Sequence, residues 1–296
     1  SSLETIYQII GEGTAAQEIT PLNWIGSISE INPTEGYWII QAIPDNLNYV
    51  GQRMNPDTEY CLTSGNNLIS YPNKDSYSLS EAFPENILNN INQIATDGLA
   101  ALKDDFGDWH GSLDVLSPWS GYWVHSTSEE EICFQFNNSY SLPRVATLIK
   151  ESLPNELKFN QSIRQSFYFI RDNNILNDND YIVATKGKVV VGAAKYSNEK
   201  YTTLPVMGDD GNIYSKNYMT NNEPVNIQIW NSDEKFKAII VPDKEIIFNN
   251  LNMEFIDSYS KTDIHPLIEK LISVHPNPFN PIINIDFSVN NTSKVI

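Results

Sequence analysis

Short apolar runs alternate with polar turn residues along most of the chain. Runs of two to five apolar or β-branched residues are separated by Gly, Pro and Asn, a pattern typical of short strands joined by turns. The run Val225–Trp230 is apolar at every second position, as in a strand with one buried face. One segment differs, because Ile87, Leu88, Ile91 and Ile94 fall at helical spacing. We therefore expect a mainly β protein whose modules each carry one short helix.

The first half of the chain contains an internal repeat with a constant offset of 85 residues. The segments Trp24–Ile28 and Gly36–Ile39 match Trp109–Leu113 and Gly121–Val124, since 109 − 24 = 85. The alignment continues without a gap over about 45 positions, which indicates two tandem modules with one fold. The segment that opens the second copy has its counterpart before residue 1. We therefore expect a chain that begins inside a repeat and is a fragment of a longer protein.

Aromatic residues in the repeat allow two interpretations. Exposed Tyr and Trp rings can stack on sugars, so Tyr37 and Tyr122 are candidate ligand contacts. Residues that both copies retain are also what a shared core needs, and neighbouring Tyr and Trp on a strand point to opposite faces. We favour core packing for one member of each Tyr-Trp pair. Trp119 is the better contact candidate, because Thr34 stands at its position in the first copy.

The 85-residue pattern stops at about residue 141, and a different series of strands follows. Several strands at short spacing, joined by Asn, Asp and Gly turns, favour a β-sandwich. The division that we predict is a partial first repeat at 1–56, a second repeat at 57–140, a β-sandwich at 141–262, and a linker with the start of a further domain at 263–296. The expected strands of the sandwich include Phe167–Ile170, Lys188–Val191, Val225–Trp230, Lys237–Val241 and Ile246–Phe248.

Charge and hydropathy exclude two classes of partner. Asp and Glu number 37 against 19 Lys and Arg, and the formal net charge of −18 repels nucleic acid and anionic lipid. No apolar run approaches the roughly 20 residues of a membrane-spanning helix. Cys61 and Cys133 are the two cysteines, too few for a zinc site of the usual pattern. They allow one disulfide of about 70 residues in an oxidising compartment, with two free buried thiols as the alternative.

Two acidic loops are candidate calcium sites. The first contains Asp172, Asp178 and Asp180, and the second contains Asp209 and Asp210. Calcium takes roughly six to eight oxygen ligands, of which closely spaced aspartates can supply two or three. Neither loop has the glutamate that closes an EF-hand, and Asp and Asn are also ordinary turn residues. Calcium is therefore the one cofactor that the sequence suggests, and ordinary turns remain the alternative.

The C-terminal segment His275–Pro281, with Pro-Asn-Pro-Phe-Asn-Pro at 276–281, precedes an alternating run with Ile283, Ile285 and Phe287. This motif resembles the opening of the C-terminal sorting domain of bacterial type IX secretion substrates, and it covers about the last two dozen residues. The resemblance implies the start of an immunoglobulin-like domain, export by the secretion machinery, and an extracellular or outer-surface location on a Gram-negative bacterium. The truncated domain cannot close a sandwich alone.

The segment 141–256 is similar to a module of the same class of secreted proteins. The matching residues are Phe167–Phe169, Val190–Ala193, Pro205–Gly211 and Pro224–Ile229. The Gly-Tyr-Trp repeats are similar to repeats in the same proteins. The resemblance implies an accessory or adhesive role without catalytic activity.

Motifs of known enzymes are absent from the sequence. The four histidines stand outside any His-Glu-x-x-His frame, and no Gly-x-Ser-x-Gly elbow or phosphate-binding loop occurs. A spatial pair of carboxylates, as in glycosidases, needs no local motif and stays open. We expect a non-enzymatic protein of adhesion or extracellular structure, whose partners are extracellular polysaccharide or another surface protein. A carbohydrate-binding region of a larger secreted hydrolase is the alternative.

Overall fold

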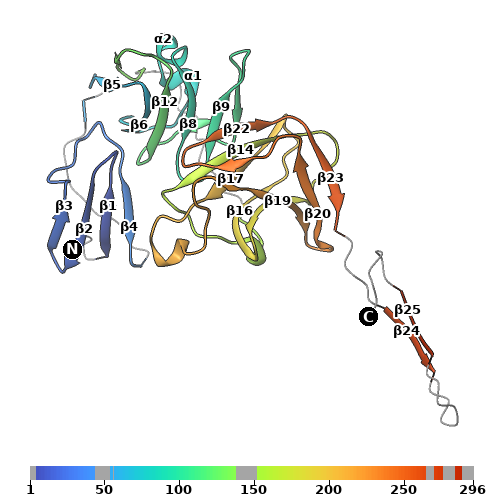
Figure 1. Cartoon of the computed structure of the whole chain (residues 1–296). Coiled ribbons are helices and arrows are strands. Elements are labelled where there is room, and N and C mark those ends of the chain that lie inside the picture. Colours follow the sequence, from blue (N-terminus) through green and yellow to red (C-terminus); the bar gives the residue numbers. More distant parts are fainter. Residues whose placement is uncertain are drawn as a thin grey trace.

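The computed structural model describes residues 5–43, 54–55, 57–137 and 152–264, together with the backbone of two C-terminal strands. The fold is mainly β, as the sequence predicts, with two helices of four residues each among the described parts. No helix in those parts has the length and apolar character needed to cross a membrane. In Figure 1 the first copy (blue) lies on the left, the second copy (cyan to green) at the top, and the sandwich (yellow to orange) on the right.

The two copies are built on antiparallel sheets of the same strand order. The first copy has the order β3-β2-β1-β4, and the second has β10-β9-β8-β12-β6. The strands of the first sheet are β1 (Ile6–Ile10), β2 (Ala15–Thr20), β3 (Asn23–Gly26) and β4 (Trp38–Gln41). The strands of the second are β6 (Gly65–Ser70), β8 (Ile91–Ala95), β9 (Ala100–Lys103), β10 (Trp109–Gly111) and β12 (Gly121–Ser126). A second layer contains β5 (Tyr60–Leu62), β7 (Tyr77–Ser78), α1 (Leu79–Ala82), α2 (Glu85–Leu88), β11 (Val115–Leu116) and β13 (Ile132–Phe134).

Strand pairing follows the 85-residue offset residue by residue. Ile9 lies opposite Ala16 in the first sheet, and Ile94 lies opposite Ala101 in the second. The pairing of β4 with β1 and that of β12 with β8 share the same register and carry a bulge at the same place. Because one residue of slip would exchange the faces of a strand, this agreement confirms that the sequence repeat is a structural repeat.

Gly26 and Gly111 stand at equivalent positions of the two copies, and the backbone requires glycine at both. Their φ angles are 146° and 144°, which L side chains rarely adopt. A Cβ atom on Gly26 would lie 2.1 Å from the carbonyl oxygen of Ala15, and one on Gly111 would lie 2.1 Å from that of Ala100. Only glycine therefore fits where β3 and β10 end against the neighbouring strand.

The helical spacing at 87–94 predicts more helix than the structure contains. The helix α2 ends at Leu88, and Ile91 and Ile94 belong to strand β8. Both isoleucines are buried in the core of the second copy, at 1% and 0% exposed. The apparent helical period arises because a short helix is followed, after a two-residue turn, by a strand that faces the same core. Both described helices belong to the second copy.

The third unit is a β-sandwich of two facing sheets. One has the order β17-β14-β22 and the other β16-β15-β19-β20-β23. The larger sheet is formed by β15 (Tyr181–Lys186), β16 (Val189–Lys195), β19 (Asn226–Asn231), β20 (Lys235–Pro242) and β23 (Tyr259–Asp263), and the smaller by β14 (Gln165–Arg171), β17 (Tyr201–Met207) and β22 (Met253–Ile256). Short elements are η1 (Asn155–Leu157), η2 (Ile213–Ser215), β18 (Glu223–Pro224) and β21 (Ile247–Phe248). The core between the sheets contains Tyr168, Ile182 and Ile229. Each of the five predicted strands of this unit overlaps an observed strand, whereas β15, β17, β22 and β23 are not among those predicted.

The second copy and the sandwich share an apolar joint. One face of β14 contributes Tyr168 and Ile170 to the sandwich core, whereas Phe167 and Phe169 on its other face pack against the second copy. The second copy contributes Ala95, Ala100 and Leu102 to this joint. Because both faces of β14 are covered, its sequence is a continuous apolar run rather than an alternating one.

The C-terminal alternating run forms a strand, as predicted. This strand, β25 (Asn284–Ser288), pairs in antiparallel fashion with β24 (Lys270–His275). The Pro-Asn-Pro-Phe-Asn-Pro motif at 276–281 lies outside the described residues.

Candidate ligand-binding groove

An open hollow on the described part of the chain lies where the first copy, the second copy and the sandwich meet. Its volume is about 580 Å³. The first copy contributes β4 and its flanking residues, from Tyr37 to Ile43, and the second contributes Trp119 to Gly121. Gln161–Ile163 and Tyr214 form the sandwich side. A hollow shared by three units and lined by aromatic rings is a suitable place for a ligand.

Trp119 is the most exposed aromatic residue of this groove. It is 84% exposed and its φ angle is 67°, an unfavourable conformation for a bulky side chain. It stands just before β12, on the turn that begins at Pro118. The sequence singled out Trp119 because the first copy lacks it, and the structure places it at the groove.

Tyr37 lies in the same groove, whereas its counterpart in the second copy does not. The Tyr37 hydroxyl accepts a hydrogen bond from the Asn32 N–H (3.0 Å) and donates one to the Glu35 carboxylate (2.7 Å). Burial is the main cause that raises the pKa of Tyr37. Tyr122 is 1% exposed, and its hydroxyl accepts a hydrogen bond from the Ser117 N–H. The prediction of Tyr122 as a ligand contact is therefore wrong, because the ring fills the core.

The carboxylate of Asp210 is occupied by hydrogen-bond donors. Its oxygens accept hydrogen bonds from the hydroxyls of Ser215 (2.6 Å), Tyr214 (2.9 Å) and Ser162 (3.1 Å). The amide groups of Asn212 donate two more. Burial by itself would raise the pKa of Asp210, but these hydrogen bonds outweigh it and lower the pKa. Asp210 thus organises its own loop, and its oxygens face donors rather than an open cation site.

The other acidic candidates do not converge either. Asp209 accepts a hydrogen bond from the Gly211 N–H, and Asp172 accepts one from the Asn174 N–H. Asp180 is 1% exposed and accepts hydrogen bonds from Asn177 and Asn231, whereas Asp178 is exposed. Within the described residues, the single group of three acidic, His or Cys side chains close enough for a metal is Glu59 with the two cysteines. The predicted calcium loops therefore have the geometry of hydrogen-bonded turns.

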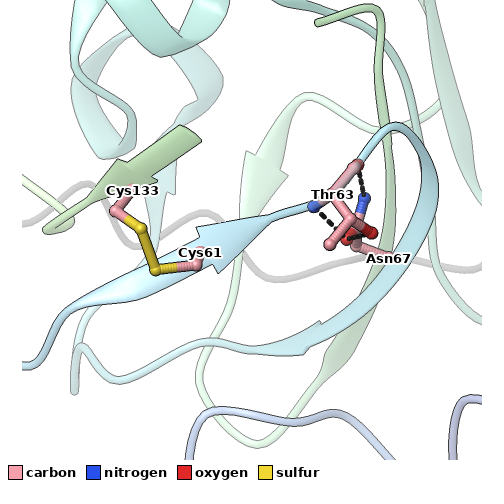
Figure 2. The surroundings of a disulfide bond; sticks show 4 residues. All are labelled: Cys61, Thr63, Asn67 and Cys133. Carbon is pink, nitrogen blue, oxygen red and sulfur yellow. Dashed lines mark hydrogen bonds between the residues drawn. A yellow bond between two sulfur atoms is a disulfide. The ribbon is translucent and has the colours of Figure 1, made fainter. Parts of the chain in front are cut away.

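Cys61 and Cys133 form a disulfide, as the sequence predicts in one of its two alternatives. They lie directly opposite each other on β5 and β13, with Cα atoms 4.0 Å apart. Both residues are exposed, and their sulfur atoms are committed to each other, so they are not metal ligands. Figure 2 shows the bond beside the turn that leads to β6. There the Asn67 side chain accepts a hydrogen bond from the Thr63 N–H and donates one to the Thr63 carbonyl oxygen.

A charged cluster at the rim of the joint has no signal in the sequence. Nε2 of His110 lies 2.8 Å from Oδ2 of Asp104, and Nζ of Lys200 lies 3.3 Å from the same oxygen. The hydrogen bond from His110 is the largest of the effects that lower the pKa of Asp104. Asp104 and His110 belong to the second copy, whereas Lys200 precedes β17 of the sandwich. The cluster ties the two units together, and residues 96 positions apart give no local pattern that could reveal it.

No protein-family model, no curated protein and no solved structure matches this chain.

Proposed function

We propose that this chain is a non-enzymatic, secreted or cell-surface modular protein that acts in adhesion or extracellular structure. The observation that carries the proposal is the joint between the second copy and the sandwich. Phe167 and Phe169 are 0% exposed there, and Tyr201 and Met253 complete the cluster from the sandwich side. A large apolar contact holds two modules in one orientation, which a spacer or adhesive stalk requires and an isolated binding module does not.

A buried side chain fixes the orientation of the joint further. Gln165 is 0% exposed, and its Nε2 donates a hydrogen bond to the carbonyl oxygen of Thr96 at 2.9 Å. Its Oε1 accepts one from the Gly98 N–H at 3.2 Å. Both partners belong to the turn between β8 and β9. Directional bonds inside an apolar contact permit one arrangement of the two units and penalise others.

The proposed location and secretion route rest on separate support. The exposed Cys61–Cys133 disulfide favours an oxidising compartment. The net charge of −18 favours solubility at a crowded surface. The Pro-Asn-Pro-Phe-Asn-Pro motif supports type IX export, with the secretion machinery as a partner. This route would place the protein on the outer surface of a Gram-negative bacterium.

Export can be tested by asking whether a reporter fused ahead of this motif leaves cells that have this route.

The joint predicts a measurable cooperativity. We expect the second copy and the sandwich to unfold in one calorimetric transition. We expect Gln165→Ala to lower the free energy of unfolding by about 1–3 kcal/mol, because it leaves buried backbone groups without partners. Gln135→Ala is the matched control, since Gln135 is exposed and donates to the carbonyl oxygen of Asp57. Two well-separated transitions in the unmodified chain would contradict the rigid stalk.

Carbohydrate binding is the second candidate function, and one observation favours it. The exposed ring of Trp119 and the ring of Tyr37 line the same groove although they come from different copies. Aromatic rings stack on the apolar faces of sugars and need little conformational entropy to do so. The groove would then serve as the recognition site of a larger secreted hydrolase or of the adhesive stalk itself.

A polysaccharide screen tests this second function. Saturable binding of a polysaccharide by the full chain is expected to weaken at least about tenfold in Trp119→Ala, a loss of roughly 1.4 kcal/mol. Phe106→Ala is the matched control, because Phe106 is 91% exposed and lies outside the groove. Equal binding by both variants would remove the groove as the sugar site. Turnover of chromogenic glycosides that one carboxylate substitution abolishes would overturn the non-enzymatic proposal.

A further inference from the structure

The groove between the three units has an acidic wall without a lining cation. The described residues that line it include the exposed carboxylate of Asp97 but no Lys, Arg or His. Arg164 follows the lining residue Ile163 in the sequence. Its guanidinium donates a hydrogen bond to the side-chain oxygen of Asn221 at 2.8 Å, and Asn221 is not a lining residue. A negatively charged ligand would therefore find no opposite charge in the groove wall.

Carboxylates also lie directly behind three hydroxyl groups of the groove. The Tyr37 hydroxyl donates a hydrogen bond to the carboxylate of Glu35 at 2.7 Å. The hydroxyls of Tyr214 and Ser162 donate to the carboxylate of Asp210 at 2.9 Å and 3.1 Å. Because each of these protons is already donated, the three oxygens can offer a ligand only lone pairs. Such a wall favours a ligand that is rich in N–H donors.

The negative charge of the chain is concentrated on two of the three units that form the groove. Residues 1–137 contain 19 Asp and Glu against 3 Lys and Arg, which is a net charge of −16 out of −18 for the whole chain. A field of this extent attracts cations and repels anions before they make contact. The surrounding field and the groove wall therefore favour the same sign of charge in a ligand.

The aromatic rings determine the rest of the ligand's chemistry. Trp119 is 84% exposed and has a φ angle of 67°, and strained conformations of this kind cluster at sites that clamp ligands. An aromatic ring stacks on the apolar face of a sugar and also attracts an ammonium group. A hexosamine with a free amine combines both features, because its ring can stack and its ammonium group carries three N–H donors and no acceptor.

We propose that the groove binds a polysaccharide that carries free amines, rather than one that is acetylated, acidic or sulfated. Trp119 would supply the ring on which a sugar stacks, and Asp97 the carboxylate that contacts an ammonium group. The inference rests on carbohydrate binding, the second candidate function, and names the class of carbohydrate.

The test titrates the full chain with a hexamer of β-linked glucosamine and with the same hexamer after acetylation of its amines, at a pH where the free amines are charged. Acetylation removes the charge and keeps the sugar rings. We expect the free-amine hexamer to bind at least about tenfold more tightly, a difference of roughly 1.4 kcal/mol. Added salt should reduce this preference, because it screens the attraction between exposed charges. The comparison uses the unmodified chain and does not depend on how any variant folds.

Two variants then assign the contacts. Trp119→Ala is expected to weaken binding of both hexamers, because both keep the ring that stacks. Asp97→Asn is expected to reduce the preference for the free-amine hexamer by at least about threefold, as for an exposed ion pair. Asp105→Asn is the matched control, since Asp105 is exposed, makes the same change of charge and lies outside the groove. We expect it to leave the preference unchanged.

The outcomes separate this inference from carbohydrate binding itself. If the acetylated hexamer binds as tightly as the free-amine hexamer and both depend on Trp119, the inference falls and the groove remains a sugar site. Binding of hexalysine as tight as that of the free-amine hexamer, unchanged in Trp119→Ala, would also overturn the inference, because charge alone would then explain it. If no saccharide binds, including those of the polysaccharide screen, the candidate function falls together with the inference.

Discussion

Removal of the Cys61–Cys133 disulfide is expected to lower the free energy of unfolding of the second copy by about 4 kcal/mol. The bond closes a loop with a sequence separation of 72 residues. An open loop of that length gives the unfolded chain many more conformations, so the unfolded state gains entropy. The measurement compares denaturant midpoints of the unmodified chain with those of a Cys61→Ser, Cys133→Ser double variant.

The second copy and the sandwich are expected to unfold together, so the loss should appear in the single transition that the two units share. The described residues of the sandwich contain no cysteine, so a reductant acts on this transition through the second copy. A change of less than about 1 kcal/mol in the double variant would contradict the prediction. It would mean that the unfolded segment stays compact without the bond.

Phe169→Ala is expected to lower the free energy of unfolding by about 3–5 kcal/mol. Phe169 is 0% exposed, and its ring centroid lies 5.4 Å from that of Phe255. Its ring also contacts the place where a Cβ on Gly111 would lie, at 2.9 Å. The truncation would leave a cavity in the apolar joint between the two modules, and such cavities are more destabilising than the lost transfer energy alone. Thermal unfolding followed by near-ultraviolet circular dichroism measures the effect.

The matched control is Phe106→Ala, the same change at a residue that is 91% exposed. Surface substitutions of this kind usually alter stability by about 0.5 kcal/mol or less. If Phe169→Ala and Phe106→Ala had similar effects, the joint would not be a continuous core. The rigid stalk of the proposed function would then lose its support, although the repeat itself would stand.

The features that the sequence predicts well are those with a local or periodic signal. The alternation at Val225–Trp230 corresponds to β19, in which Ile227 and Ile229 are buried. The 85-residue offset corresponds to the identical register of the two sheets. The two cysteines form a disulfide, which is one of the two predicted alternatives, the other being two free buried thiols.

The features that the sequence predicts poorly depend on contacts between distant segments. Ile91 and Ile94 continue the helical spacing of the residues in α2 only because α2 and the strand β8 face the same core. The acidic loop at Asp210 resembles a cation site in the sequence, because the sequence does not show which donors surround the carboxylate. One of these donors, the hydroxyl of Ser162, lies 48 residues away along the chain. Tyr37 and Tyr122 are equivalent in sequence, yet Tyr37 lines a groove, whereas Tyr122 is buried with its ring 6.3 Å from that of Tyr71. Tyr71 precedes the aligned strands of the second copy, so the repeat pattern alone does not reveal this contact.

The position of the disulfide determines how a pulling force would pass through the chain. Cys61 lies on the first strand of the second copy and Cys133 on its last, with most of the repeat between them. Tension applied at the two ends would enter at one sulfur and leave at the other, so the intervening residues would carry none of it. Because the residues between the two cysteines would stay unextended, the stretched chain would be about 240 Å shorter than the same chain without the bond, at roughly 3.4 Å per residue. The part of the second copy between the two cysteines could therefore hold its fold under loads that unravel modules without such a bond.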